Sequence, residues 1–332
     1  MKNSPVLITG GAGYIGSHTV LACRAASYPV VVLDNLSKGR RDLVPEAVPF
    51  YDGDVGDAKL LARIFEKHRV AAGIHFAGAT VVPESVAAPL AYYLSNTCKT
   101  RNLLQGCIDH GIDRFVFSST AAVYGEPDAV PVRESAPTRP ANPYGSSKLM
   151  VEWMLRDTAR AHGLRHVILR YFNVAGADPE GRSGQATPDA THLIKVACEA
   201  ITGKRPGIEI YGDDYDTPDG TCVRDFIHVS DLARAHVSAL DYLARHRESV
   251  TLNCGYGRGY SVREVLDAIQ RIAGRPLAIR TAPRRPGDVG AVIADASRLR
   301  AVFDWVPEHD SLDDILRTAL EWERREASRA IA

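Results

Sequence analysis

The sequence lacks close cysteine pairs and long apolar segments. Its six cysteines are scattered through 332 residues without a C-x-x-C spacing, a distribution that suggests neither a zinc site nor a disulfide framework. No apolar run approaches the roughly 20 residues needed to cross a bilayer. The first expected strand is reached by about Val6, which leaves no room for a signal peptide. We therefore expect a cytoplasmic protein with no metal site and no membrane partner.

An excess of charge of either sign is also missing. Forty Lys and Arg residues balance forty Asp and Glu residues, so the formal net charge is zero. No overall field would draw such a chain to nucleic acid, and we expect no nucleic-acid partner. Hydrophobic residues make up 45% of the chain and charged residues 24%, as is ordinary for a globular protein. The length allows one large domain and a smaller one.

Short apolar runs alternate with longer helical patterns through the first half of the chain. The expected buried strands are residues 5–9, 30–34, 73–77, 114–118 and 166–170. The clearest helical patterns between them are residues 57–68, 90–110 and 144–162. This alternation predicts βαβ units, and hence an α/β fold with a doubly wound parallel sheet.

The composition changes after about Gly176. Residues 177–190 and 212–221 are rich in Gly, Pro, Asp and Thr, which indicates ordered loops around a ligand or a domain junction. Residues 225–243 are typical of a strand followed by a helix. We therefore expect the chain to return to the first sheet at about 222–250.

The rest of the chain predicts few further elements. The glycine-rich residues 255–259 are interpreted as a turn before a helix that begins near Ser261, rather than as a second nucleotide site. Residues 261–327 contain two amphipathic helical patterns and a short strand or two.

A glycine-rich stretch, "TGGAGYIG" (9–16), connects the first expected strand to the next helix. Gly10, Gly13 and Gly16 recur at three-residue spacing, so the backbone can approach a pyrophosphate at the N-terminus of the helix. The second strand ends in Asp34, 18 residues after Gly16, where an acid would bind the adenosine ribose 2′-OH. The pattern therefore predicts a dinucleotide cofactor.

The acid favours NAD over NADP as that cofactor, because Asp34 would repel a 2′-phosphate. Arg40 and Arg41 follow soon after Asp34 and leave NADP as the alternative. We expect a Rossmann NAD-binding domain in residues 1–176 and a smaller α/β substrate-binding domain formed mainly by residues 177–332.

A second motif, "NPYGSSK" (142–148), places Tyr144 and Lys148 four residues apart. Asn142 can cap a helix whose first residue is Pro143, so Tyr144 and Lys148 would share one helical face. The lysine ammonium and a positively charged nicotinamide would both favour the tyrosine phenolate. A surface Tyr/Lys pair is the alternative, but the glycine loop upstream favours Tyr144 as a general base.

The hydroxyl-rich stretch "SSTAAVYG" (118–125) ends the fourth of the expected strands quoted above. Ser118 and Ser119 suit a strand end, where hydroxyls cap free backbone groups. Alternatively, one of the three hydroxyls of Ser118, Ser119 and Thr120 points into a reaction site. Tyr124 either flanks the substrate or packs in the core.

Together these motifs resemble those of the extended short-chain dehydrogenase/reductases, and within them the UDP-glucose 4-epimerase family. The resemblance runs almost end to end, through residues 9–19, 31–37, 75–78, 118–125, 142–148, 169–177, 212–233 and 282–288. It implies reversible, NAD-dependent epimerisation at C4 of a UDP-hexose through a transient 4-keto sugar. It also implies a homodimer, formed through the helices at 90–110 and 144–162.

The resemblance also assigns the site residues. The implied catalytic residues are Tyr144, Lys148 and Thr120. Besides Tyr144 and Lys148, the implied cofactor contacts are Gly10, Gly13, Tyr14, Ile15, Gly16, Asp34, Asn35, Asp54, Val55, Phe76, Ala77, Gly78, Asn96, Ser118, Ser119, Tyr171 and Phe172. Besides Thr120 and Tyr144, the implied substrate contacts are Asn173, His192, Leu193, Tyr211, Arg224, Arg285, Asp288 and Val292.

Three positions depart from the pattern of the relatives. Thr80 stands where many have a lysine that contacts the cofactor phosphates, which predicts weaker retention of NAD. His192 stands where some have an asparagine, and a histidine beside a diphosphate would make binding pH-dependent, unless it is a neutral structural residue. Val292 replaces a tyrosine of some strict glucose/galactose epimerases, which predicts room for an N-acetyl group at C2 of the sugar.

Three other functions are weighed against epimerisation. A 4,6-dehydratase would need an acid and a base where this chain has Ala121 and Ala122, neither of which transfers a proton. A UDP-glucuronate 4-epimerase or decarboxylase shares the scaffold and stays open. A non-catalytic NAD-binding regulator is disfavoured by the intact set of Thr120, Tyr144 and Lys148.

Overall fold

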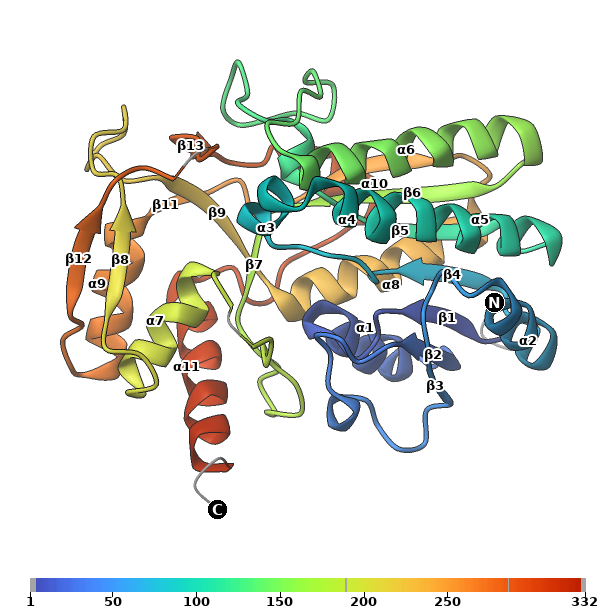
Figure 1. The fold of residues 1–332 in the computed structure, drawn as a ribbon, viewed down its shortest axis with the longest axis horizontal. Coiled ribbons are helices and arrows are strands. Elements are labelled where there is room, and N and C mark those ends of the chain that lie inside the picture. The colour runs from blue at the N-terminus through green and yellow to red at the C-terminus, as the bar shows by residue number, and fades with distance from the viewer. Residues whose placement is uncertain (1–3, 189, 286, 330–332) are drawn as a thin grey trace.

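A computed structural model of the chain describes residues 4–188, 190–285 and 287–329. Its centre is a parallel sheet with the strand order β10-β6-β5-β4-β1-β2-β3 (Figure 1). The strands are β1 (Val6–Thr9), β2 (Val30–Asp34), β3 (Phe50–Asp52), β4 (Ala72–His75), β5 (Arg114–Thr120), β6 (Arg165–Tyr171) and β10 (Val250–Cys254). The predicted doubly wound Rossmann sheet is confirmed, and its order up to β6 is the 3-2-1-4-5-6 order of dinucleotide-binding folds.

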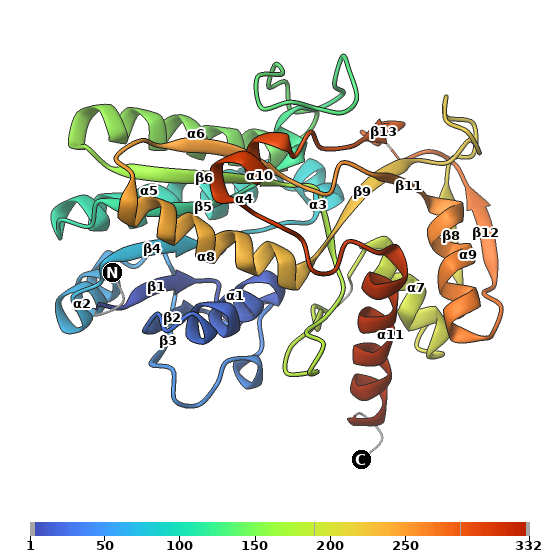
Figure 2. The same cartoon turned by 180° about the vertical axis from the view of Figure 1, so that it is seen from behind.

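Helices cover both faces of this sheet, as Figures 1 and 2 show from opposite sides. On one face Ile8 and Val32 join the core that contains Val20 of α1 and Leu240 of α8. On the other face Leu7, with its side chain directed oppositely, joins the core under α2, α5 and α6. The bounds are α1 (Tyr14–Ala25), α2 (Ala58–His68), α5 (Lys99–Asp109), α6 (Pro143–His162) and α8 (Val229–Arg245). Burial of both faces explains why the strands are continuously apolar.

The helix that carries Tyr144 begins where the sequence predicts. The side chain of Asn142 accepts a hydrogen bond from the N–H of Gly145, and Pro143 occupies the first turn of α6. The helix ends at Gly163, whose φ of 72° is the left-handed conformation that glycine adopts without strain. A capped helix of this length gives its side chains fixed directions.

The remaining strands form a smaller α/β region beside the large sheet. β9 (Val223–His228) pairs with β7 (Asn173–Ala175), β11 (Gly259–Ser261) and β13 (Ala291–Val292), while β8 (Ile208–Tyr211) pairs with β12 (Ile279–Ala282). Helices α7 (Leu193–Ile201), α9 (Val262–Ala273), α10 (Ser297–Phe303) and α11 (Leu312–Arg329) complete it. Short helical segments also occur at η1 (Arg41–Leu43), α3 (Val82–Ala87), α4 (Pro89–Tyr92), η2 (Tyr93–Cys98) and η3 (Ala121–Val123).

The structure differs from the sequence prediction at three places. The strand expected near residue 225 is β9, which belongs to the smaller sheet; the chain then returns to the large sheet with α8, which packs against it, and with β10 beside β6. The helix expected over 90–110 is interrupted by the π-helical segment η2. Residues 261–327 hold three helices instead of two, because α10 has only seven residues and is too short to show a helical period.

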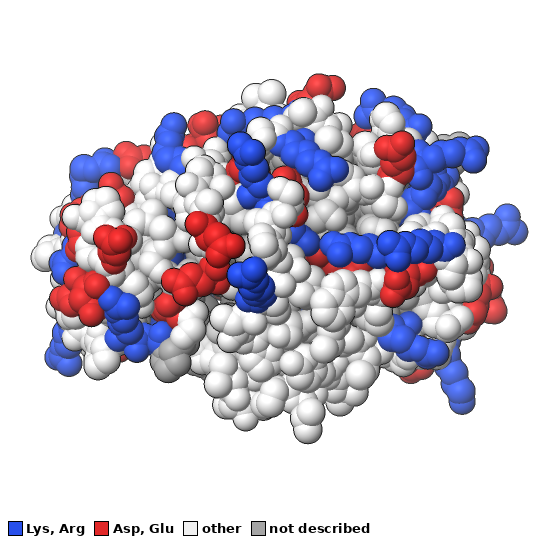
Figure 3. Space-filling model, turned by 90° about the horizontal axis from the view of Figure 1, so that it is seen from above, with Lys and Arg blue, Asp and Glu red and all other residues white. Residues whose placement is uncertain are grey.

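Charge is spread over the surface without a dominant sign. In the face shown in Figure 3, basic and acidic side chains are interspersed, as the zero net charge of the sequence implies. None of the helices within the described residues is both long and apolar enough to span a bilayer.

Candidate active site

The carboxyl end of β1 leads into a tight glycine loop. Gly10 has a φ of 72°, and a Cβ there would lie 2.5 Å from the N atom of Ala77. A Cβ on Gly16 would lie 2.1 Å from the carbonyl oxygen of Gly10. Gly13 is the N-cap of α1 and brings no capping side chain, so the first N–H groups of the helix keep no side-chain partner there. Such a loop suits a pyrophosphate.

The close approach at Gly16 gives a prediction. The variant Gly16→Ala must displace the backbone at Gly10, so we expect the purified protein to retain about tenfold less NAD, or none. The measurement is NAD released per chain on denaturation. Gly106→Ala is the matched control, because its added methyl group in α5 meets only the side chains of Phe65 and Leu61. Equal NAD content in both variants and the wild type would refute the assignment of the loop.

Asp34 lies beside the glycine loop at the end of β2. Its Oδ2 accepts from the N–H of Ala12 at 2.9 Å and its Oδ1 from that of Leu36 at 2.8 Å. Each carboxylate oxygen keeps a second lone pair for a ribose hydroxyl. The guanidinium of Arg40 is paired with Asp42 and Glu326, and that of Arg41 donates to the carbonyl of Val44. Neither arginine is therefore poised for a 2′-phosphate, which favours NAD.

Two further strand ends complete this edge of the sheet. After β3, Asp54 pairs with Lys99 at 2.5 Å, and the neighbouring Asn35 contacts it. Lys99 was not predicted from the sequence, because it lies 45 residues away on α5 and has no motif. The lysine holds the pKa of the Asp54 carboxyl below its usual value, even though burial alone would raise it. Val55 is buried next to Asp54.

After β4, Phe76, Ala77 and Gly78 pass under the glycine loop. The side chain of Asn96 clamps the next residue, since its Oδ1 accepts from Ala79 N at 2.7 Å and its Nδ2 donates to Ala79 O at 3.0 Å. A Cβ on Gly78 would meet Asn96 Oδ1 at 2.7 Å. Asn96 thus shapes the loop, in addition to any contact with a cofactor.

Tyr144, Lys148 and Thr120 meet at the end of β5. The hydroxyl of Thr120 is hydrogen-bonded to that of Tyr144. The Nζ of Lys148 donates to the carbonyl oxygen of Ser118 at 3.0 Å and lies 3.9 Å from the position of a Cβ on Gly78. The predicted catalytic residues are therefore brought together, next to the loop predicted to hold the cofactor.

The electrostatics differ from the prediction. Burial raises the pKa of Tyr144 above its ordinary value, although the hydrogen bond from Thr120 opposes this. Burial also lowers the pKa of Lys148 from 10.5 to about 8. Lys148 alone therefore does not make Tyr144 a phenolate; the reason is that desolvation disfavours both charged forms. A cation bound beside the phenol is needed for that step.

Tyr171 ends β6 opposite Thr120 and is buried. Its hydroxyl lies 2.6 Å from Nε2 of His236 on α8, and the ring of His236 lies 4.8 Å from that of Phe76. His236 also contacts the carbonyl of Leu232 with Nδ1, and burial lowers its pKa to about 4, so it is neutral. His236 was not predicted, because no local pattern marks a partner on a distant helix.

At three other predicted cofactor contacts, the side chain contacts other parts of the protein. The hydroxyl of Ser119 donates to Glu152 at 2.6 Å because alternate residues of a strand face opposite sides of the sheet. Phe172 is buried in the cluster that contains Val292. The hydroxyl of Tyr14 donates to the carbonyl of Gly176. The side chains of Ser119 and Phe172 thus contact the core, and their contact with the cofactor stays a prediction.

Four predicted substrate residues gather around β9. Asn173 pairs in register with Phe226, and the ring of His192 lies edge-on to Phe226 at 6.2 Å. Arg224 pairs in register with Val292 and donates to the carbonyl of Val223. Both ring nitrogens of His192 are buried without a hydrogen-bond partner, and burial lowers the pKa of this histidine to about 4. The histidine is therefore neutral in the chain alone.

Three other predicted substrate residues lie at or near the β8–β12 pair: Tyr211 ends β8, and Arg285 and Asp288 follow β12. The guanidinium of Arg285 covers the ring of Tyr211, 3.5 Å from its centroid, and the N–H of Asp288 donates to the carbonyl of Arg285. Leu193 is the first residue of α7, directly after His192.

A family model matches residues 6–255 and is described as the NAD dependent epimerase/dehydratase family. It covers three quarters of the chain, from β1 to the end of β10. The chain belongs to this family. The predicted resemblance to this family is thereby confirmed.

Known epimerases resemble the chain throughout. A UDP-glucose 4-epimerase of Azospirillum brasilense is 61% identical over 96% of this chain and 92% of its own. The structure of the UDP-glucose 4-epimerase from Bifidobacterium longum in complex with NAD+ and UDP has a TM-score of 0.93 at 39% identity, covering 97% and 98% of the two chains. The UDP-Glc/GlcNAc 4-epimerase of Campylobacter jejuni has a TM-score of 0.85 at 47% identity, covering 97% and 99%.

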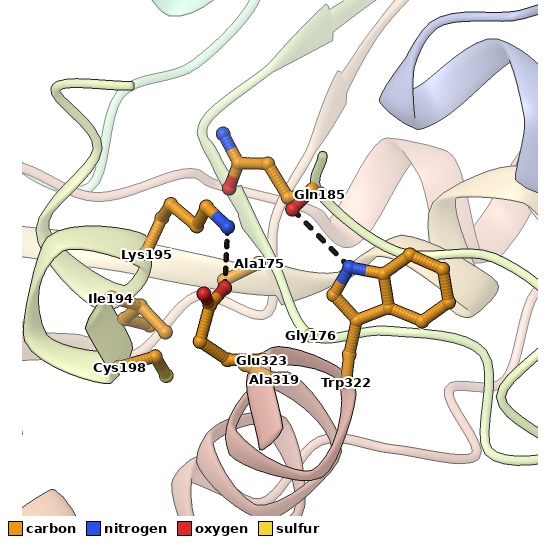
Figure 4. A pocket seen from close by; sticks show the side chains of 9 residues that line it. All are labelled: Ala175, Gly176, Gln185, Ile194, Lys195, Cys198, Ala319, Trp322 and Glu323. Carbon is orange, nitrogen blue, oxygen red and sulfur yellow. Dashed lines mark hydrogen bonds and ion pairs between the residues drawn. The ribbon is translucent and has the colours of Figure 1, made fainter. Parts of the chain in front are cut away.

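A small cavity in this enzyme lies away from Tyr144, between α7 and α11 (Figure 4). The buried Lys195 and Glu323 form an ion pair at its wall, and Trp322 donates to the carbonyl of Gln185 at 3.3 Å. These contacts fasten α7, whose first turn carries Leu193, to the C-terminal helix. The residues that line the cavity therefore help to hold the predicted substrate-binding region in place.

One group of side chains in the described residues has the spacing of metal ligands, namely His228, His309 and Asp314. Its members already have partners. Nδ1 of His228 accepts from the N–H of Ser230, its Nε2 contacts the hydroxyl of Thr318, and Nδ1 of His309 contacts Asp314 at 2.6 Å. We assign no metal role to these residues.

Proposed function

We propose that the chain catalyses reversible epimerisation at C4 of a UDP-hexose, with UDP-glucose and UDP-galactose as the substrate pair. The observation that carries the proposal is the meeting of Thr120, Tyr144 and Lys148 beside a glycine loop at one edge of the sheet. The function of the similar proteins agrees with it.

The glycine loop and Asp34 suit NAD. Cβ atoms added to the glycines would fill the space that a pyrophosphate needs to approach the backbone. When bound, NAD supplies a hydride acceptor and donor for C4 and a positive charge near Tyr144. Lys148 would hydrogen-bond the nicotinamide ribose. Residues 1–176 would form most of the NAD-binding domain, which α8 and β10 complete, and residues 177–332 most of the substrate side.

The protein residues move one proton in each direction. Thr120 would hydrogen-bond the sugar 4-OH and relay its proton to the phenolate of Tyr144. The 4-keto sugar forms only when C4 also gives up a hydride, for which bound NAD would supply the acceptor. The neutral phenol then returns the proton to O4 after the sugar has turned over. Arg224 and Arg285 would hold the diphosphate, and Tyr211 and Asp288 the uridine, so that the sugar itself is loosely held.

A coupled assay tests this proposal. The purified enzyme should convert UDP-galactose into UDP-glucose without added NAD, because the cofactor returns to its starting redox state in each cycle. An absolute need for a second redox substrate would contradict it. UDP-galacturonate or CO2 formed from UDP-glucuronate at a higher kcat/KM would favour the alternative, UDP-glucuronate 4-epimerase or decarboxylase. Ala121 and Ala122 offer no acid or base for a dehydratase.

The wall beside the sugar gives a prediction about specificity. Val292 lies opposite Arg224 in the β13–β9 ladder, and its small side chain supports room for an N-acetyl group. We expect turnover of UDP-GlcNAc and UDP-GalNAc as well. Val292→Tyr should lower kcat/KM for the acetylated pair by about 10-fold or more and spare the other pair. Undetectable turnover of the acetylated pair by the wild type would refute this.

An exposed apolar face supports a homodimer. Leu90 is 80% exposed and Leu94 57% exposed one helical turn later, and Trp153 on the adjacent α6 is 50% exposed. Large apolar side chains grouped in this way favour a protein partner, and we propose a second copy of the chain.

The free state of all six cysteines supports the cytoplasm as the location of the protein.

The dimer is tested by substitution on that face. The wild type should have the mass of two chains in light scattering, and the double variant Leu90→Glu, Trp153→Glu the mass of one, because two buried charges would oppose pairing. Val306→Glu is the control, since Val306 is 67% exposed outside these helices. A wild type that is monomeric at about 10 μM, where a stable dimer persists, would exclude the dimer.

A further inference from the structure

A buried ion pair lies directly behind the reacting groups. Glu152 on α6 is 0% exposed and Arg170 on β6 is 2% exposed. Arg170 donates from Nη2 to Oε2 of Glu152 at 2.6 Å and from Nε to Oε1 at 2.9 Å, which makes the contact bidentate. Because both charges lose their hydration, such a pair adds little to the stability of a fold. Its geometric precision points to a different role.

Glu152 of the ion pair is linked to both elements that carry the reacting groups, α6 and β5. Glu152 follows Lys148 by four residues and Tyr144 by eight, so all three lie on one face of α6. Oε1 of Glu152 also accepts from the hydroxyl of Ser119 at 2.6 Å, and Ser119 directly precedes Thr120. The carboxylate of Glu152 therefore links α6 to the end of β5.

Arg170 connects this contact to two more strands, β6 and β10. Ser119 and Arg170 are register partners between β5 and β6, and the next register pair joins Thr120 to Tyr171. Nη1 of Arg170 donates to the hydroxyl of Tyr124 at 2.8 Å, which in turn donates to Asn253 on β10 at 2.7 Å. The buried network therefore joins α6 to the carboxyl ends of β5, β6 and β10.

We propose that Glu152 and Arg170 are positioning residues that hold α6 against β5 and β6 so that the hydroxyls of Tyr144 and Thr120 stay in hydrogen-bond contact. The proposal rests on the proposed function for the reaction that these hydroxyls serve. It also gives Tyr124 a structural role, because its ring is 1% exposed and its hydroxyl is used within the network. Tyr124 thus packs in the core and does not flank the substrate.

The pair acts through geometry, because its two charges cancel. The described influences on the pKa of Tyr144 are its burial and the hydrogen bond of Thr120. A small slide or rotation of α6 would lengthen that hydrogen bond. A misplacement of about 1 Å can lower a rate by about 10²-fold. The binding of UDP, which we assign to the smaller sheet, would not change.

The test compares three variants with the wild type. Glu152→Leu combined with Arg170→Met removes both charges together, since apolar replacement of a whole buried pair is often tolerated. Arg170→Lys keeps the charge but loses the two-pronged contact. Arg156→Gln is the control: Arg156 touches Oε2 of Glu152 at 3.2 Å from the solvent side, with its side chain 41% exposed.

Four quantities are measured for each protein. They are the thermal unfolding midpoint, the Kd for UDP, kcat and KM for UDP-galactose, and the pKa of Tyr144 from tyrosinate difference absorbance against a Tyr144→Phe background. We expect the double variant and Arg170→Lys to lose at least about tenfold in kcat with the Kd for UDP unchanged within about twofold. The pKa of Tyr144 should rise in both variants, and Arg156→Gln should match the wild type.

Two results would overturn the proposal. One is a kcat within about twofold of the wild type in a folded Arg170→Lys or double variant, and the other is a parallel loss of kcat and UDP affinity, which would show general loosening. The titration of Tyr144 keeps this test separate from the proposed function. If the wild type does not epimerise UDP-galactose, the proposed function fails and kcat no longer tests the positioning role; an unchanged Tyr144 pKa in the folded variants would then overturn that role.

Discussion

Tyr144→Phe should lower kcat for UDP-galactose by about 10²- to 10⁴-fold, the usual contribution of a general base. The substitution removes only the hydroxyl that meets Thr120 and leaves the buried ring in place. Because the base acts as the phenolate, the rate of the wild type should also fall as the pH falls below the pKa of Tyr144 in the NAD-bound enzyme, whereas the variant should show no such limb. The measurement is the pH dependence of kcat for both proteins.

Two controls separate this effect from damage to the fold. The Tyr144→Phe protein should retain NAD and bind UDP as the wild type does. Tyr28→Phe removes the hydroxyl of another buried tyrosine. Tyr28 lies just before β2, far along the chain from Tyr144, and its hydroxyl donates to Asp241 on α8. The Tyr28→Phe protein should keep most of the activity. A Tyr144→Phe variant with wild-type kcat would refute the assigned base.

Lys148→Met should abolish most of the activity and yet stabilise the cofactor-free chain at neutral pH. Burial lowers the pKa of Lys148 from 10.5 to about 8, so the folded state holds an unfavourable charge below pH 8. At 1.36 kcal/mol per pKa unit the penalty is roughly 3 kcal/mol, and it is offset in part by the hydrogen bond to Ser118. We expect the free energy of unfolding at pH 7 to rise by roughly 1–3 kcal/mol.

The sign of the pH dependence checks the cause. Between about pH 8 and 10.5 the folded wild type has released the Lys148 proton while the unfolded chain still holds it. The stability of the wild type should therefore rise with pH in this window, and the advantage of the methionine variant should shrink. Denaturant unfolding of both cofactor-free proteins at several pH values measures this. A variant less stable than the wild type at pH 7 would contradict the account.

Much of the fold is predictable because it follows from burial. β2 occupies residues 30–34, as predicted, since a strand buried on both faces must be apolar throughout. The cap at Asn142 and the capping box at Ser261 mark helix starts by local chemistry alone. By contrast, the π-helical segment inside the 90–110 pattern has no such signal, because it depends on contacts made by Asn96 with a distant loop.

The candidate site divides in the same way. Motifs within a few residues of each other, such as Tyr144 and Lys148, are visible in sequence and meet in the structure. Apart from Arg156, the partners of Glu152, Arg170 and Asn253 lie between 18 and 129 residues away, so no local spacing indicates them. The raised pKa of Tyr144 in the chain alone was not predicted for a related reason: the sequence shows the neighbouring lysine but not how deeply both groups are buried. Which residues touch NAD or UDP stays a prediction.

The central claim is that C4 of the sugar is oxidised and reduced within one closed cycle. UDP-galactose that carries deuterium at C4, incubated with the wild type in ordinary water, tests it most directly. The account predicts UDP-glucose that keeps the deuterium at C4, because the hydrogen leaves and returns as a hydride that does not exchange with solvent. Loss of the deuterium to water would contradict the account, since it would mean that C4 is deprotonated rather than oxidised.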